Sequence, residues 1–274
     1  MSVIVPPIKT HGIKTKILPW ILSHVPSDYE VYYEPFMGSG VVGFNIKPAH
    51  AVFADTNRHV IAFYEALKYG DIEPDGVRDF LEREGEKLRD SDGSYYYEVR
   101  ERFNESWSPM DFLFLVRSCF NGVMRFNKSG KFNVPFCKNP KRFSIAYITK
   151  IVNQVKSVFE LIHDHDWKFL CQGFSDTLIE PCRLDLVYCD PPYLGRNTGY
   201  YDGWTLEEEQ CLFESLSKGK YKFMLSTWSD RGHQHNEHID KWHKFRIEQY
   251  THFYRVGPKP ENRYTIQEAL VLNF

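Results

Sequence analysis

The stretch that decides the expected fold is residues 185–193, Asp-Leu-Val-Tyr-Cys-Asp-Pro-Pro-Tyr. Its apolar start predicts a short buried strand. Pro191 and Pro192 cannot donate hydrogen bonds to a sheet or lie inside a helix, so the chain must leave the sheet after Asp190. Open α/β sheets bind ligands at the carboxyl ends of their strands. A carboxylate, a rigid run of backbone carbonyls and the ring of Tyr193 at such an edge suit a flat heteroaromatic ring that carries an exocyclic amine.

The composition indicates an ordinary soluble globular protein of one large domain, or of a core domain with a sizeable insertion. With 34 basic and 36 acidic residues, the net charge does not by itself indicate nucleic-acid binding. Residues 1–16 lack the apolar stretch of a signal peptide, and no apolar run is long enough to span a membrane. The six cysteines lack CxxC spacing. We therefore expect a reduced, cytoplasmic protein of a bacterium or phage, without membrane contact.

A second junction of strand and helix carries glycines. Residues 31–34 predict a strand, Gly38-Ser39-Gly40 a turn, and the residues from Val41 onward a helix. Glycines allow positive φ and close approach of the backbone to a ligand, and a helix amino terminus offers unpaired N–H groups. The motif is neither GxGxxG nor a phosphate loop. Taken alone, it fits a structural turn as well as a binding turn.

Asp55 ends the next predicted strand, residues 51–55, and a helix is expected at 57–68. An acid at the end of the second strand, after a glycine turn, is the position that binds a ribose in nucleoside-binding folds. The alternative is that Asp55 caps the following helix. We favour the ligand role because of the turn upstream.

Strand and helix stop alternating between about residues 70 and 160. We expect helices at 75–88, 95–103 and 143–161, and residues 127–130 predict a hairpin turn between two aromatic strands. Seven basic residues and no acids lie between positions 117 and 142: Arg117, Arg125, Lys128, Lys131, Lys138, Lys141 and Arg142. Arginine can read guanine edges, lysine can neutralise phosphates and aromatic rings can wedge between bases. We favour DNA contact over the alternative, a hairpin with an ordinary charged face.

The remaining patterns complete an α/β sheet of about seven strands. Further strands are predicted at 168–172, 221–228, 245–250 and 266–273, with a helix at 206–217. Histidines cluster at 163–166 and 233–238, but these clusters lack the cysteine spacing typical of zinc sites. We interpret them as solvated loops and expect no metal.

Three motifs, in this chain order, resemble those of the Dam-like (alpha-group) family of DNA adenine-N6 methyltransferases. They are residues 34–40, residues 125–127 with 132–136, and residues 190–193. The resemblance covers about residues 9–274 and is greatest to EcoRV-type modification methyltransferases, through residues 6–9, 118–122 and 146–150. It implies a Rossmann-like seven-stranded methyltransferase sheet formed by residues 1–68 and 161–274. It also implies an inserted DNA target-recognition domain, residues 69–160, that is mainly helical and carries a β-hairpin.

The resemblance implies S-adenosylmethionine as methyl donor, S-adenosylhomocysteine as product and N6 of a flipped adenine in duplex DNA as acceptor. The catalytic positions would be Asp190, Pro191, Pro192 and Tyr193. The cofactor-binding positions would be Thr10, Lys14, Glu34, Phe36, Gly38, Ser39, Gly40, Asp55, Phe174 and Asp190. Thr10 stands where the methyltransferase of the GATC system has a tryptophan, so cofactor stacking is not expected there.

The same resemblance assigns DNA-reading roles. Lys9 and Arg125 would read guanines, Val123 and Pro135 would lie next to thymine, and Phe120 would intercalate. Further DNA contacts would come from Asn121, Asn127 and Lys138. The implied target begins GAT, with GATATC favoured over GATC. A monomeric enzyme of a restriction–modification system, with a nuclease that acts separately, is expected.

Two other classes remain open from the residues. One is a methyltransferase that acts on RNA or on a protein amide, and the basic aromatic insertion argues against the protein substrate. The other is a DNA-binding regulator that kept the fold and lost turnover, against which the intact Asp-Pro-Pro-Tyr motif argues. For the enzyme, we expect Asp190 and the Pro191 carbonyl to accept the two N6–H bonds, Tyr193 to stack on the base, and residues 196–203 to close over it.

Overall fold

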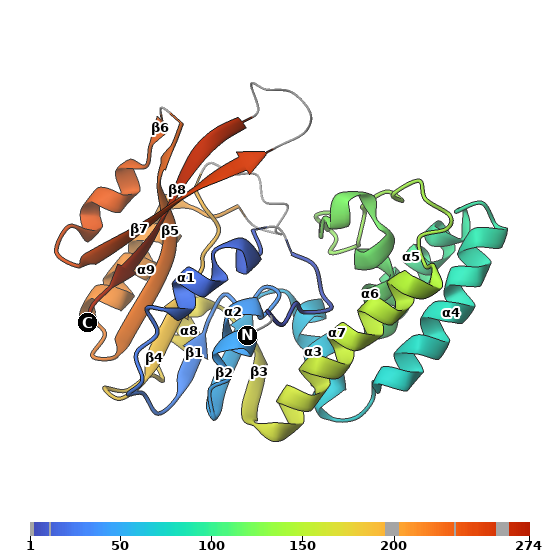
Figure 1. Cartoon of the computed structure of the whole chain (residues 1–274), viewed down its shortest axis with the longest axis horizontal. Coiled ribbons are helices and arrows are strands. Elements are labelled where there is room, and N and C mark those ends of the chain that lie inside the picture. The colour runs from blue at the N-terminus through green and yellow to red at the C-terminus, as the bar shows by residue number, and fades with distance from the viewer. Residues whose placement is uncertain (1–2, 11, 195–202, 233, 256–262) are drawn as a thin grey trace.

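The computed structural model describes residues 3–10, 12–194, 203–232, 234–255 and 263–274. One mixed sheet has the strand order β3-β2-β1-β4-β5-β8-β7, and β6 pairs with β5 (Figure 1). The strands are β1 Tyr32–Glu34, β2 His50–Asp55, β3 Asp166–Cys171, β4 Leu186–Cys189, β5 Lys222–Arg231, β6 Gln234–His235, β7 Arg246–Arg255 and β8 Arg263–Leu272. The expectation of about seven strands in one α/β sheet is confirmed.

The order of strands brings two distant parts of the sequence together. Strands β1 to β5 pair in parallel, whereas β8 pairs antiparallel with both β5 and β7. The chain runs outward from β1 to β2 and β3 and then returns to β4, which lies directly beside β1. Open α/β sheets bind ligands beyond the carboxyl ends of the strands where such a reversal occurs. The glycine turn after β1 and Asp190 after β4 therefore share one edge of the sheet.

Helices cover both faces of the sheet. Tyr32 and Tyr33, neighbours on β1, are both buried but lie in different core clusters, because successive side chains of a strand point to opposite faces. One face packs against α1 Leu18–Leu22, α2 Val41–Ile46, α3 Arg58–Lys68 and α7 Ile145–Asp164, and the other against α8 Phe174–Thr177, α9 Leu206–Lys218 and η3 Glu237–Trp242. Burial on both faces explains why the central strands read as continuous apolar runs.

The segment between α3 and β3 is helical and extends beyond β3 at one end of the molecule (Figure 1). Its first elements are α4 Pro74–Asp90, α5 Tyr95–Ser106, α6 Pro109–Ser118 and η2 Phe120–Gly122. The helices predicted at 75–88, 95–103 and 143–161 are confirmed as α4, α5 and α7. Helix α6 was not predicted because residues 111–118 are all buried, so they show no apolar periodicity.

The predicted hairpin is reduced to its turn. The Gly130 N–H donates to the Asn127 carbonyl at 2.8 Å, but the flanking residues form isolated bridges, Cys119 with Phe136 and Phe126 with Phe132, instead of strands. Two backbone bonds flank the second bridge, from the Asn127 N–H to the Lys131 carbonyl at 2.9 Å and from the Asn133 N–H to the Arg125 carbonyl at 3.1 Å. The Asn104 side chain accepts the N–H of Phe132 at 2.7 Å and donates to its carbonyl at 3.2 Å. The Phe132 backbone groups face away from Phe126, and a helix side chain satisfies their hydrogen bonds.

A histidine joins α3 to this turn. His59 stacks on Trp107 at 4.9 Å and on Phe126 at 5.0 Å between ring centroids. Burial, assisted by the charge of Arg58, lowers the pKa of His59 to about 4. A neutral aromatic ring on the sheet domain therefore holds Phe126, the residue next to Arg125.

A buried carboxylate holds α4, α5 and α6 together. Glu84 is 2% exposed and accepts hydrogen bonds from Tyr95 at 2.6 Å and from Arg102 at 2.9 Å, and Arg102 also bonds Asp111. Burial opposes ionisation, but these bonds, with those from Lys87 and Arg83, lower the pKa of Glu84 to about 2. Glu84 therefore stabilises the fold above its ordinary pKa of 4.5, and the contribution is lost as the pH falls toward 2.

We expect Glu84→Gln to lower the free energy of unfolding by about 2 kcal/mol at pH 7, because charge-assisted hydrogen bonds are lost. The difference in stability between wild type and variant should shrink as the pH falls below 4.5. In that range Glu84 takes up a proton when the wild-type protein unfolds, whereas the glutamine is neutral throughout. Denaturant melts over this pH range measure it. Glu82→Gln, which removes an exposed helix ion pair with Arg78, serves as the control and should change stability by about 0.5 kcal/mol or less. Equal effects of the two variants at every pH would contradict the role of Glu84.

Candidate active site and nucleic-acid interface

Residues 190–193 follow β4 and form a corner that begins with Asp190, called the acidic corner below. A lysine from near the start of the chain holds it. Lys14, in η1 Lys14–Lys16, places its Nζ 2.7 Å from Oδ1 of Asp190. Lys14 is 7% exposed, so this ion pair is largely removed from solvent. Removal of either partner would leave the other charge without its nearest partner.

Tyr193 extends the same network to strand β8. Lys14 Nζ lies 3.2 Å from the Tyr193 hydroxyl, and this hydroxyl donates to Oε2 of Glu268 on β8 at 3.3 Å. Sequence reasoning missed Glu268. The available signal was a single acid at the start of the apolar end of the chain, residues 266–272, where Gln267 is the other polar residue.

Electrostatics favour a charged Lys14. Burial would lower the pKa of Lys14, but Asp190, Tyr193 and Glu268 together hold it well above its ordinary value. Burial raises the pKa of Asp190, and the ammonium of Lys14 opposes this rise. The lysine therefore keeps Asp190 available as an anionic hydrogen-bond acceptor.

The glycine turn after β1 has the backbone geometry that its sequence predicts. Gly38 and Gly40 have φ values of +51° and +75°, and a Cβ on Gly40 would lie 2.7 Å from the ring of Phe44. Asp55 Oδ2 accepts the Gly38 N–H at 2.7 Å, and its Oδ1 accepts the Asn57 N–H at 2.8 Å. Asn57, not Asp55, caps α3. The carboxylate at the end of β2 thus fixes the turn.

Glu34 and Ser39 support the turn from within the protein. The Glu34 carboxyl group accepts hydrogen bonds from the Tyr32 hydroxyl and the Gly43 N–H, both at 3.0 Å. Burial raises the pKa of Glu34 to about 8, so its neutral form predominates at pH 7. Ser39 is buried, and its carbonyl accepts a bond from Tyr64 at 2.7 Å.

Aromatic rings gather beside the turn. Phe36 stacks on Phe174 with centroids 5.4 Å apart, and Trp204 lies 5.6 Å from each of them. Thr10 is also at the turn, since its Oγ1 would lie 3.8 Å from a Cβ on Gly38. All the predicted cofactor-binding residues except Glu34 and Ser39, which are engaged internally, therefore surround the same edge of the sheet.

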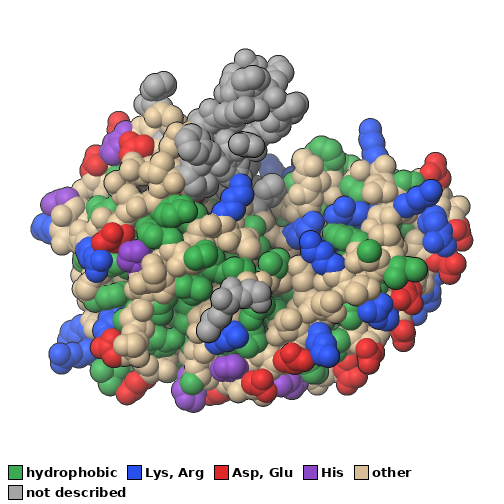
Figure 2. All heavy atoms as spheres, in the orientation of Figure 1, with side chains coloured by type: hydrophobic (Ala, Val, Ile, Leu, Met, Phe, Trp, Pro, Cys, Tyr) green, Lys and Arg blue, Asp and Glu red, His purple; other side chains and the backbone are tan. Residues whose placement is uncertain are grey.

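The predicted DNA-reading residues come from two segments that the fold brings together. The Phe120 N–H donates to the Pro135 carbonyl at 2.8 Å, and Lys9 approaches Gly122 closely enough that a Cβ there would lie 3.2 Å from its Cδ. Phe120 is 52% exposed although it is a large apolar residue. Figure 2 shows basic side chains spread over this helical half of the molecule.

The predicted DNA-reading side chains differ in how far they are exposed to solvent. Arg125 is exposed, and its guanidinium is braced by the Asn133 side chain at 2.9 Å. Val123 is half-buried, and Asn121 and Lys138 are exposed residues with positive φ. The Asn127 side chain accepts the N–H groups of Ser129 and Lys131, so it organises the turn.

The prediction of a basic aromatic surface was wrong for two groups of residues. Arg117 is 2% exposed because it lies on the buried helix α6, where it bonds Gln154. The phenylalanines that alternate with the basic residues are core residues, in contrast to Phe120: Phe126, Phe132, Phe136 and Phe143 are all buried. An interior helical core, not a stacking surface, accounts for their spacing.

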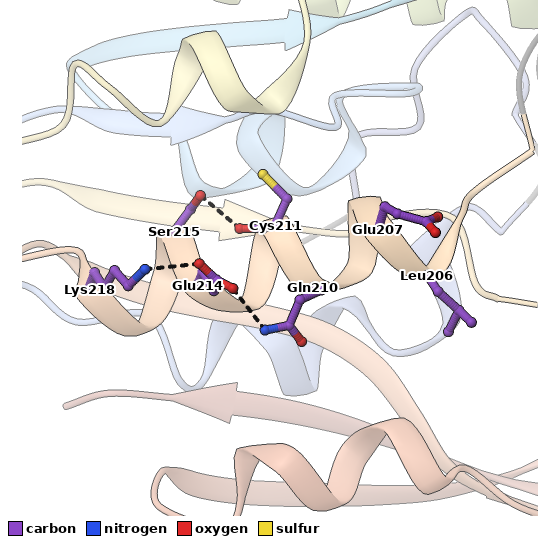
Figure 3. Close-up of a pocket in the computed structure, with 7 residues that line it drawn as sticks. All are labelled: Leu206, Glu207, Gln210, Cys211, Glu214, Ser215 and Lys218. Atoms are coloured by element: carbon purple, nitrogen blue, oxygen red, sulfur yellow. Dashed lines mark hydrogen bonds and ion pairs between the residues drawn. The ribbon is translucent and has the colours of Figure 1, made fainter.

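A surface groove lies outside the predicted sites. An open groove along α9 is lined by Leu206, Glu207, Gln210, Cys211, Glu214, Ser215 and Lys218, none of which belongs to the predicted sites (Figure 3). Within the described ranges, no group of three or more His, Cys, Asp or Glu side chains could hold a metal ion. No helix in these ranges has the length and apolar character needed to cross a bilayer.

A doubly wound sheet whose central strands end in a glycine turn and in Asp-Pro-Pro-Tyr has the architecture of a Rossmann-like methyltransferase. Residues 11–256 match the family described as D12 class N6 adenine-specific DNA methyltransferase, and the chain belongs to this family. It is therefore an adenine-N6 DNA methyltransferase.

Named relatives agree with this assignment. The chain is 29% identical to the Type II methyltransferase M.FokI of Planomicrobium okeanokoites over its whole length, which spans 43% of that relative. It is 31% identical to the DNA adenine methylase of Escherichia coli K12, covering 76% of this chain and 73% of the relative. It is 30% identical to the Type II methyltransferase M.MjaIII of Methanocaldococcus jannaschii, covering 81% and 83%.

Proposed function

We propose that this protein transfers a methyl group from S-adenosylmethionine to N6 of an adenine flipped out of duplex DNA, within a site that begins GAT. GATATC is favoured over GATC. The observation that carries the proposal is the meeting of the glycine turn after β1 with Asp190 after β4 at one sheet edge. The exposed basic residues of the adjoining helical segment supply the contact with DNA.

The residues at this edge fit S-adenosylmethionine. Positive φ at Gly38 and Gly40 keeps the turn free of side chains. The Asp55 oxygens each retain a lone pair that can accept a ribose hydroxyl, and Phe36 and Phe174 offer ring faces for an adenine. When bound, the donor supplies a methyl group already activated by a positively charged sulfur.

The acidic corner orients the acceptor. The N6 lone pair of adenine is delocalised into the ring, so the amine is a poor nucleophile. Asp190 and the Pro191 carbonyl accept one N6–H each, which directs the lone pair away from the ring plane. Lys14 holds one carboxylate oxygen of Asp190 and leaves the other for the base. Pro192 stiffens the corner, and Tyr193 stacks on the flipped adenine. Orientation of this kind is worth about 7 kcal/mol or more.

The helical segment, residues 69–160, acts as the target-recognition domain. Lys9 and Arg125 read guanines, Val123 and Pro135 contact the thymine methyl, and the exposed ring of Phe120 enters the base stack. Asn121, Asn127 and Lys138 add contacts to the DNA backbone. Residues 196–203 were expected to close over the base, and positions 195–202 lie outside the described residues.

The names of two relatives support a proposal for the biological setting. Two of the relatives described above are named Type II methyltransferases, which supports a place in a restriction–modification system with a separate nuclease. We propose a monomeric enzyme that acts in the cytoplasm of a bacterium or phage-infected cell.

The test is methyl transfer from labelled donor to a panel of duplexes that differ only in the central site. The proposal predicts N6-methyladenine in GATATC, less in GATC and none where GAT is scrambled. Label in cytosine, in RNA or in protein would contradict the proposed substrate. Equal label in all adenine-containing duplexes would contradict the proposed site.

We expect Arg125→Ala to relax sequence choice at one base pair, at a cost of about 1–3 kcal/mol for the preferred duplex. The reason is that Asn133 holds the guanidinium in one orientation, as base reading requires. Competition binding against single-base variants of the site measures the effect. Arg89→Ala, on the exposed surface of α4, is the matched control and should leave the ranking unchanged. Uniform weakening on every sequence would make Arg125 a phosphate contact.

A further inference from the structure

Glu268 occupies an unusual place in the sheet. On β8 it pairs with Trp228 of β5 and Tyr250 of β7. Alternation along the strand puts Glu268 on the same face as Leu270 and Leu272, which are buried in the core that also contains residues of α1. A carboxylate at the end of an apolar row is costly unless it has a polar partner.

One polar partner of Glu268 is the Tyr193 hydroxyl. The hydroxyl lies between two charged groups: Lys14 donates to its oxygen at 3.2 Å, and its own proton points to Oε2 of Glu268 at 3.3 Å. Burial, with the charges of Glu268 and Asp190, raises the pKa of Tyr193, so the hydroxyl keeps the proton that it donates. One donor and one acceptor together fix the direction of the O–H bond.

Lys14 and Glu268 hold the Tyr193 hydroxyl in different ways. Lys14 also pairs with Asp190 at 2.7 Å and sits 5.2 Å from the centroid of the Tyr193 ring, so it follows movements of the corner itself. Glu268 belongs to a strand that is paired on both sides. Its bond therefore ties the end of the Asp-Pro-Pro-Tyr motif to the rigid sheet.

We infer that Glu268 is a positioning residue for adenine methylation: its carboxylate holds the Tyr193 hydroxyl and thereby sets the plane of the ring on which the target adenine stacks. This inference rests on the proposed roles of Asp190 and Tyr193. It predicts that Glu268 acts through the hydroxyl of Tyr193, so its removal matters little once that hydroxyl is gone.

A double-mutant cycle tests this coupling. Glu268→Ala and Tyr193→Phe are each expected to slow single-turnover methyl transfer at saturating donor and DNA by about 10-fold, as for loss of a charge-assisted hydrogen bond. The double variant should also be slowed by about 10-fold. Independent effects would instead multiply to about 100-fold. Glu268→Gln, whose amide oxygen still accepts the bond, should retain more activity than Glu268→Ala.

Controls separate positioning from structural damage. Glu248→Ala on the neighbouring strand β7 removes a surface ion pair with Arg246 and should leave the rate unchanged. Donor affinity should stay within about twofold of wild type in the Glu268 variants, since the glycine turn is untouched. Multiplicative losses, or an unchanged rate in Glu268→Ala, would overturn the inference. A wild-type protein that leaves adenine unmethylated would instead refute the proposed function, so the two failures are distinguishable.

Discussion

Replacing Asp190 with alanine is expected to slow methyl transfer by about a thousandfold or more, while most of the DNA affinity survives. The carboxylate is proposed to be one of two acceptors for the adenine amine, and loss of one oriented polar group at a reacting centre typically costs about 10²- to 10³-fold. Loss of its charge near the positively charged methyl donor adds to this. The proposed DNA-reading residues lie on other elements and should keep their positions, so we expect binding of the duplex to be largely retained.

The experiment needs a variant that keeps the shape of the corner. Asp190→Ala also leaves the ammonium of Lys14 without its nearest partner in a buried setting, which can destabilise the fold. Asp190→Asn keeps the volume and one hydrogen-bond acceptor, so comparison of the two separates charge from shape. Asp28→Ala, in the exposed loop before β1, controls for loss of a surface acid. Single-turnover rates near those of wild type in both Asp190 variants, with thermal melts showing folded protein, would exclude the assigned role.

Replacing Lys14 with methionine is expected to move the acidic limb of the pH–rate profile to higher pH. Burial raises the pKa of Asp190 and Lys14 opposes the rise, so loss of Lys14 lets that pKa rise further. An opposite charge at this range is worth about 1–3 pH units. The variant should therefore lose most activity at the acidic end of the profile and recover part of it as the pH rises, because Asp190 then ionises.

Stability limits the pH range of this test. A carboxyl group whose pKa is higher in the folded than in the unfolded protein stabilises the fold at low pH, and that contribution is lost as the pH rises through the folded-state pKa. Rates are therefore compared where melts show folded protein, and at saturating donor, since Lys14 also lies at a proposed cofactor position. Lys16→Met, an exposed residue of the same short helix, is the control. A loss of activity that is equal at all pH values would contradict a role for Lys14 in holding Asp190 ionised.

Local chemistry accounts for what the sequence could predict. Proline at 191 and 192 forces the chain out of the sheet, and glycine at 38 and 40 allows positive φ, so both junctions could be located without coordinates. Strands with two buried faces read as apolar runs, which located the central strands. The Dam-like resemblance, confirmed at the level of the family, then connected these junctions to adenine methylation.

Long-range contacts account for the rest. The N–H and carbonyl of Phe132 bond the side chain of Asn104, 28 residues away, and the local sequence pattern does not predict this contact. The sequence predicts Arg117 to be a surface cation, because it does not show that residues 111–118 of α6 are all buried. Glu268 is 75 residues from Tyr193, so their bond depends on the strand order β4-β5-β8, which periodicity cannot supply.

The central claim is that Asp190 and the Pro191 carbonyl bind the amine of an everted adenine. A crystal structure of the protein with a GATATC duplex and a non-reactive analogue of the donor tests it most directly. We expect N6 of the target adenine within about 3 Å of a carboxylate oxygen of Asp190 and of the Pro191 carbonyl. An adenine that remains stacked in the duplex, or one whose amine contacts neither group, would contradict it.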